Sequence, residues 1–151
     1  MTIMTVGELL DRGWDFETRF IAYYTEIREH SADNDVRLLT YYLARHRRHQ
    51  EEALAGLTSD MRRHLRKVEL TFDAPFDIDA DFALPACAPE AVTGVELIEM
   101  AIRHDRELVS FYRSILSQPL NDGVRGFIES LVRLEERDIV MLKKMLAMHY
   151  F

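Results

Sequence analysis

Apolar residues recur every three or four positions along four long segments of the chain, which is the spacing of one face of an α-helix. These segments cover approximately residues 6–30, 35–57, 94–117 and 123–149. Thr5 with Glu8, and Thr93 with Glu96, have the spacing of a capping box at the start of the first and third helices. A shorter helix is expected over residues 59–66. The pattern therefore predicts an all-α protein.

The connections between these helices differ in length. The first and second helices are joined by a few residues, as are the third and fourth, and short links make antiparallel neighbours. Residues 68–92 contain three of the four prolines and form a long crossover. Within them, residues 68–72 favour a strand but have no obvious partner. We expect a single domain over residues 1–151, an antiparallel four-helix bundle with helix pairs at about 5–57 and 93–148.

The two helix pairs resemble each other in sequence. Thr5 aligns with Thr93 and Glu17 with Asp105 at an offset of 88 residues, and the second helices align at an offset of 89, so that His49 meets Asp138. Because the two offsets nearly agree and both halves begin with the same cap, we interpret the chain as a duplication. We therefore expect a pseudo-two-fold axis between the halves.

Each apolar stripe is interrupted by an acid or a histidine, and only near its midpoint. These six candidate metal ligands are Glu17, His46, His49, Asp105, Glu135 and Asp138. Antiparallel helices of similar length bring their midpoints into one layer, so the six side chains should converge. Buried carboxylates are unfavourable unless they are paired, protonated or bound to a metal. Carboxylate and imidazole suit iron, manganese or zinc, and residues three apart on a helix can reach one cation.

This layout resembles the ferritin-like superfamily, including the rubrerythrin-like di-iron proteins. In that family two helices each supply one Glu and the other two each supply Glu-x-x-His. Glu17 and Asp105 match the single acids, and H-R-R-H at 46–49 and E-E-R-D at 135–138 match the two motifs. The resemblance implies a ferritin-like fold, iron as the cofactor with manganese or zinc as alternatives, oxidase or peroxidase chemistry, and a homodimer.

The resemblance also implies roles for the six positions. Glu17 and His49 would bind one cation, with Glu135 as a bridge or a further ligand. A second, weaker site would be completed by the remaining candidates, Asp105, Asp138 and His46, the histidine serving either cation.

Three of the six positions depart from the family pattern. His46 stands where a bridging Glu is expected, Asp138 stands where a His is expected, and Asp105 is a shortened acid. A mononuclear site, an asymmetric pair of metals and an emptied site therefore remain alternatives. The competing interpretation is a metal-free helical bundle whose histidines bond to Glu17 and Glu135 and which acts through its surface.

The composition of the chain limits the kinds of partner that the protein is expected to bind. The net charge of −7 argues against nucleic acid and anionic membranes as partners, and the single cysteine, Cys87, excludes an internal disulfide. The sequence shows neither a signal peptide nor an apolar run of membrane-spanning length, so we expect a soluble, cytoplasmic protein. We also expect a small-molecule substrate, which the sequence does not identify. Trp14, Phe16 and Tyr23 lie off the main stripe of the first helix, and we expect a homodimer to use that face.

Overall fold

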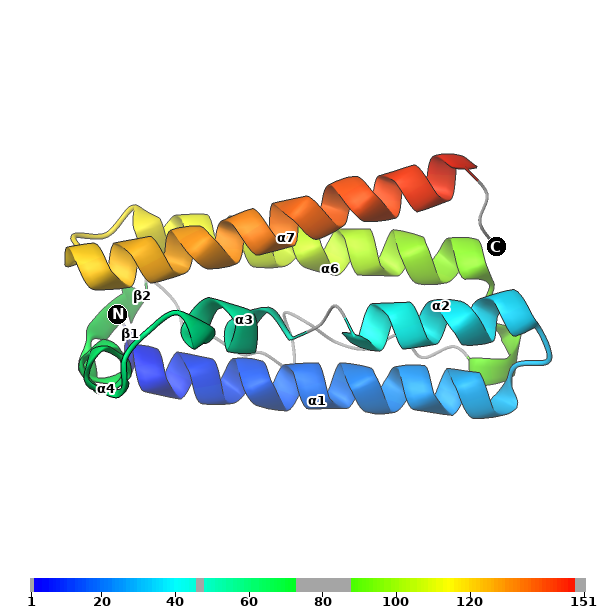
Figure 1. Ribbon diagram of the computed structural model, residues 1–151, viewed down its shortest axis with the longest axis horizontal. Helices are drawn as coiled ribbons and strands as arrows, with labels where there is room; N and C mark the ends of the chain where they lie inside the picture. Colours follow the sequence, from blue (N-terminus) through cyan, green and yellow to red (C-terminus); the bar gives the residue numbers. More distant parts are fainter. Residues whose placement is uncertain (1, 46–47, 73–87, 149–151) are drawn as a thin grey trace.

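The computed structural model describes residues 2–45, 48–72 and 88–148, and the described chain is mainly helical (Figure 1). In chain order the elements are β1 (Thr2–Thr5), α1 (Val6–His30), α2 (Asn34–Arg45), α3 (His49–Ala55), α4 (Ser59–Lys67), β2 (Glu69–Phe72), the 3-10 helix η1 (Pro89–Ala91), α6 (Gly94–Leu116) and α7 (Asp122–Met148). The prediction of a predominantly α-helical protein is confirmed. The central part of the expected crossover, with Cys87, lies outside the described residues.

Side-chain caps define where the long helices begin. The Thr5 hydroxyl accepts a hydrogen bond from the Glu8 amide at 3.1 Å and starts α1. At α6 the box is complete, because the Thr93 hydroxyl accepts from the Glu96 amide at 3.1 Å and the Glu96 carboxylate accepts from the Thr93 amide at 3.3 Å. Each bond satisfies a backbone N–H that has no partner within the helix.

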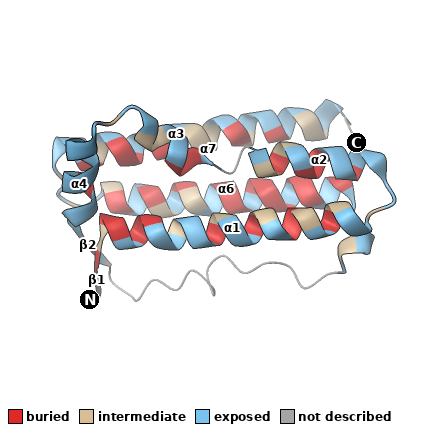
Figure 2. Cartoon of the chain, turned by 60° about the horizontal axis from the view of Figure 1, so that its bottom comes forward, coloured by how far each residue is buried: buried red, intermediate tan, exposed pale blue. Residues whose placement is uncertain are grey.

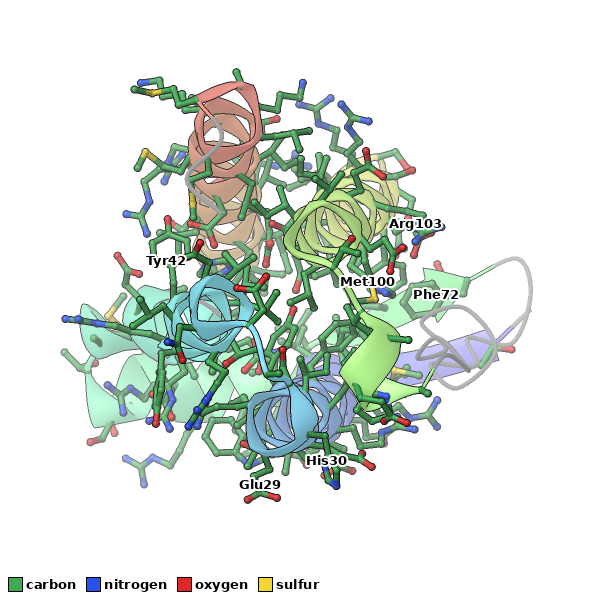
Figure 3. All side chains as sticks on the ribbon, turned by 90° about the vertical axis from the view of Figure 1, so that its right-hand side faces the viewer. Glu29, His30, Tyr42, Phe72, Met100 and Arg103 are labelled. Atoms are coloured by element: carbon green, nitrogen blue, oxygen red, sulfur yellow. The ribbon has the colours of Figure 1, made fainter. Side chains whose placement is uncertain are left out.

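The long helices lie alongside one another. α2 and α3 follow each other along α1, while α6 and α7 form an antiparallel pair (Figure 1). Viewed along the helix axes, α1, α2, α6 and α7 surround a common centre that side chains fill (Figure 3). Buried residues are concentrated on the faces that the helices turn toward this centre (Figure 2). Within the described ranges, no helix combines the length and the apolarity needed to cross a bilayer.

The apolar core forms two clusters along the helix axes. One contains Phe20, Tyr24 and Ile98, and the other contains Leu70 and Ile128. α1, α6 and α7 contribute to both clusters, so each long helix passes from one to the other. In α6 and α7 the polar middle, which contains Asp105, Glu135 and Asp138, lies between residues of the two clusters.

The helix expected over residues 35–57 is interrupted. α2 ends at Arg45 and α3 begins at His49, and Arg48 before it has φ −95° and ψ 41°, outside the helical region. Residues 46 and 47, which include the candidate ligand His46, lie outside the described residues. The interruption therefore falls at the level of the expected polar layer.

The expectation that residues 68–72 have no strand partner is wrong. β2 pairs in antiparallel fashion with β1, with Thr2 opposite Phe72 and Thr5 opposite Glu69. The outer edge of β2 is covered by Gln118, whose side chain accepts from the Thr71 amide at 3.0 Å and donates to the Thr71 carbonyl at 2.5 Å. The side-chain amide thus takes the place of a neighbouring strand.

Candidate metal centre

His49 lies between two carboxylates of α7. Its Nδ1 is 2.7 Å from Glu135 Oε1 and its Nε2 is 2.6 Å from Asp138 Oδ2. The three residues are 3%, 3% and 6% exposed, so the contact is inside the core. Glu135 and Asp138 are three apart on α7, which places both on the face that meets α3. The structure therefore brings three of the six candidate ligands into direct contact.

The protonation of His49 follows from these two contacts, of which the one through Nδ1 is a hydrogen bond and the one through Nε2 is a close ion-pair contact. Burial alone would lower the pKa of the His49 imidazole, but the interactions with Asp138 and Glu135 outweigh it and raise the pKa to about 10. At neutral pH the ring is then an imidazolium between two carboxylates.

Asp105 belongs to the same level of the molecule. It is the central residue of α6, as Glu135 is the central residue of α7, and the two antiparallel helices are joined by a short turn. Asp105 is 2% exposed. The predicted layer therefore contains a further buried acid on the helix next to α7.

Glu17 lies at the margin of the buried face of α1. It is half-buried and lines an outward-facing hollow of ≈ 220 Å³ together with Trp14 and Arg48. The buried face of α1 includes Phe16 and Tyr23, although both lie off the main apolar stripe of this helix in the sequence. The expectation that these two aromatic residues form an exposed dimer face is therefore wrong, and of the three only Trp14 is exposed.

The sequence pattern gave a site role to neither Tyr42 nor His104. Tyr42 is half-buried between α2 and α7 (Figure 3), and its pKa is raised by burial and by the Asp138 carboxylate. His104 is 5% exposed and packs edge-on against Phe20 at 4.6 Å between ring centroids. The signal for Tyr42 was its place in the stripe of the second helix. His104 had no comparable signal.

The donor atoms are of the types that bind divalent cations, and one carboxylate oxygen has no partner among the described residues. Glu135 Oε2 is buried and accepts no hydrogen bond from the described residues, which is unfavourable for a carboxylate oxygen. Among these residues, no three His, Cys, Asp or Glu side chains surround a common point as metal ligands do. The reason is visible in the geometry, since both nitrogens of His49 contact carboxylates directly.

Comparisons with protein families, with characterised proteins and with solved structures found no significant match to this chain. The functional interpretation depends on the geometry and chemistry of the site.

Proposed function

We propose that this protein is a ferritin-like four-helix bundle that binds a divalent transition-metal cation in its polar layer. The observation that carries the proposal is the surplus of buried acid over buried base. Glu135, Asp138 and Asp105 are all at most 6% exposed, whereas the buried imidazoles among the described residues are His49 and His104, and His104 packs against Phe20. A divalent cation would neutralise this surplus.

The free oxygen of Glu135 supports the same conclusion. Buried polar atoms in native proteins nearly always have a partner. Glu135 Oε2 has none among the described residues, although its Oε1 is bonded to His49. A bound cation is the kind of partner that a carboxylate oxygen in this position accepts.

Glu135, Asp138 and His49 are the residues that would hold the cation, and Asp105 lies at the middle of the neighbouring helix α6. One nitrogen of His49 would bind the metal while the other keeps its carboxylate partner, an arrangement common in metal sites. His49 must release its second carboxylate contact for this to happen. A redox-active metal bound here would supply the oxidase or peroxidase chemistry that the family resemblance implies.

A metal-free protein is the second candidate, and one observation favours it. Both nitrogens of His49 already contact acids, at 2.7 and 2.6 Å, so the histidine alone compensates part of the buried charge. In this reading the cluster is a structural network that joins α3 to α7, and the protein acts through its surface.

Metal-dependent melting separates the two candidates. Protein purified without an affinity tag and stripped of metal should melt at a higher temperature after addition of Fe²⁺, Mn²⁺ or Zn²⁺. A cation that binds only the native state stabilises it by about 2.7 kcal/mol at a hundredfold excess over Kd. Asp138→Asn should remove most of this shift, whereas His30→Ala, at an exposed histidine at the end of α1, should preserve it.

The opposite outcome is equally clear. If the native sequence shows the same melting temperature with and without all three metals, the metal proposal is wrong and the metal-free network remains.

A further inference from the structure

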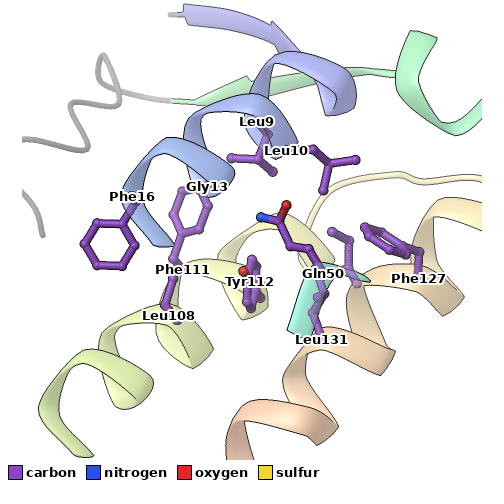
Figure 4. A pocket seen from close by; sticks show the side chains of 11 residues that line it. Leu9, Leu10, Gly13, Phe16, Gln50, Leu108, Phe111, Tyr112, Phe127 and Leu131 are labelled. Carbon is purple, nitrogen blue, oxygen red and sulfur yellow. The ribbon is translucent and has the colours of Figure 1, made fainter. Parts of the chain in front are cut away.

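A second feature of the core lies apart from the polar layer. A hollow opens between α1, α3, α6 and α7, and its walls are apolar side chains such as Leu9, Leu10, Phe127 and Leu131 (Figure 4). Two side chains with polar groups also line it, Gln50 from α3 with its amide and Tyr112 from α6 with its hydroxyl (Figure 4). The hollow therefore combines a mainly apolar lining with an amide that can both donate and accept a hydrogen bond.

Gln50 is an unusual residue for this position. It is 7% exposed, and no hydrogen bond joins its side chain to any residue within the described ranges. An amide in a mainly apolar surrounding is unfavourable unless it has a hydrogen-bond partner, and a leucine or methionine of similar size would avoid that penalty. The amide is therefore explained best by a partner that is not part of the chain.

The opposite wall is adapted to this amide. A Cβ atom placed on Gly13 would lie 2.1 Å from Gln50 Nε2, far inside van der Waals contact. Gly13 stands in the interior of α1, where glycine weakens a helix relative to alanine. The missing side chain at Gly13 thus leaves the room that the Gln50 amide itself occupies.

The size of the hollow limits what it can hold. The free space for a water-sized molecule is ≈ 20 Å³. About 10–15 Å³ of such space is enough for one water molecule. The apolar walls also disfavour a charged guest, because the neutral polar groups of Gln50 and Tyr112 would not compensate for the desolvation of a charge.

We propose that this hollow is a binding site for one small uncharged hydroxyl compound, water or a short alcohol, held by the Gln50 amide. The amide N–H donates to the hydroxyl oxygen of the guest and the amide carbonyl accepts from its O–H. Gly13 provides the room in which the amide and the guest meet. This site needs no metal, so it would exist whether the protein is the metal-binding or the metal-free bundle described above.

Nuclear magnetic resonance of the ¹⁵N-labelled protein tests the site directly. The side-chain NH₂ signals of Gln50 are identified as the pair that disappears in Gln50→Met, a substitution that keeps the approximate shape and removes the amide. In the native protein these signals should show cross-relaxation with a long-lived bound water. Methanol should shift them in a saturable way if alcohols also enter, whereas tert-butanol, which is too large for the space, should not.

Two glycine variants supply the matched comparison. Gly13→Ala should abolish the water contact of the Gln50 NH₂ group and any methanol response. Gly126→Ala, in α7, should leave both unchanged, because a Cβ there has nothing within 4 Å. Water contact without a methanol response identifies the guest as water alone.

The native protein decides the proposal even if Gly13→Ala does not fold. A Gln50 NH₂ group that shows neither a long-lived water contact nor a saturable methanol shift would overturn it. So would a Gly13→Ala protein that folds and keeps the response in full.

Discussion

His49 contacts its two acidic neighbours through both ring nitrogens, and this decides what the residue can do. A histidine that binds a metal keeps one nitrogen for the cation and usually gives the other to a carboxylate or carbonyl. In the structure the second nitrogen is also engaged, by Asp138 at 2.6 Å. The ring is thus a protonated link between α3 and α7 in the metal-free protein, and the same ring is the first group that a cation must rearrange.

This protonated link makes the stability of the metal-free protein depend on pH. The pKa of His49 is raised to about 10, above the value of about 6.5 expected for an unfolded chain. A raised folded-state pKa stabilises the protein fully below the unfolded pKa, and this stabilisation is lost as pH rises from about 6.5 through 10. We expect the free energy of unfolding to fall across this window by up to about 1.4 kcal/mol per pH unit from this group.

Urea denaturation in the presence of a chelator, at several pH values between 6 and 10, measures this effect. Other groups titrate near pH 10, so the informative quantity is the difference between the native protein and His49→Gln. The difference should shrink as pH rises. Parallel curves for the two proteins would show that His49 is not held as an imidazolium.

At the scale of the elements, local signals predicted the structure well and non-local ones were not visible. The caps at Thr5 and Thr93 placed the starts of α1 and α6 correctly, because a cap depends only on residues three positions apart. The pairing of β1 with β2 joins residues more than sixty positions apart, and no local pattern records it. The interruption before His49 was also missed, since the helical period continues across it.

In the candidate site, too, features with a local signal were predicted and features that depend on packing were not. Periodicity placed Glu135, Asp138 and Asp105 correctly on the buried faces of α6 and α7. It did not show that Glu17 lies at the margin of its helix, because the buried face of α1 is wide and its direction depends on packing. Gln50 was missed because a polar residue on an amphipathic helix is ordinarily assigned to the exposed side.

The capping box of α6 provides a test at this scale. Thr93→Ala removes the hydroxyl that accepts from the Glu96 amide, and loss of such a cap typically destabilises a protein by about 1 kcal/mol. Thr18→Ala is the control, because the Thr18 hydroxyl is exposed and donates only to the Trp14 carbonyl of its own helix. Thermal unfolding of both variants should show a lower melting temperature for Thr93→Ala. Equal melting temperatures would mean that the box contributes nothing measurable.

The edge of β2 provides another test. Gln118→Ala removes both hydrogen bonds to the Thr71 backbone, so the Thr71 amide should exchange its hydrogen faster. A bond contributing roughly 0.5–1.5 kcal/mol corresponds to an acceleration of roughly threefold to tenfold. Hydrogen exchange at the Thr71 amide measures it, and the Leu70 amide, on the same strand, serves as the internal reference. An unchanged rate at Thr71 would show that the side chain does not protect the edge.

At the scale of the whole molecule, the polar middle separates two apolar clusters without dividing the protein into two units. Leu108 and Ile139 pack against both clusters. α1, α6 and α7 each supply residues to both, so opening one end exposes apolar surface on helices that the other end needs. The expected superposition of the two helix pairs stays a prediction, and the continuous α7 has no counterpart to the interruption between α2 and α3.

Because the helices are shared, we expect the protein to unfold in one cooperative transition. Ile27 and Ile128 are fully buried, one in each cluster, and form a matched pair. Ile27→Val and Ile128→Val should each destabilise the whole protein by roughly 0.5–1.5 kcal/mol. Helix content, followed by circular dichroism, and the fluorescence of Trp14, the only tryptophan, should report the same urea midpoint in each variant. If Ile128→Val shifts the circular dichroism transition but leaves the Trp14 midpoint in place, the two ends unfold separately and the polar layer divides the fold.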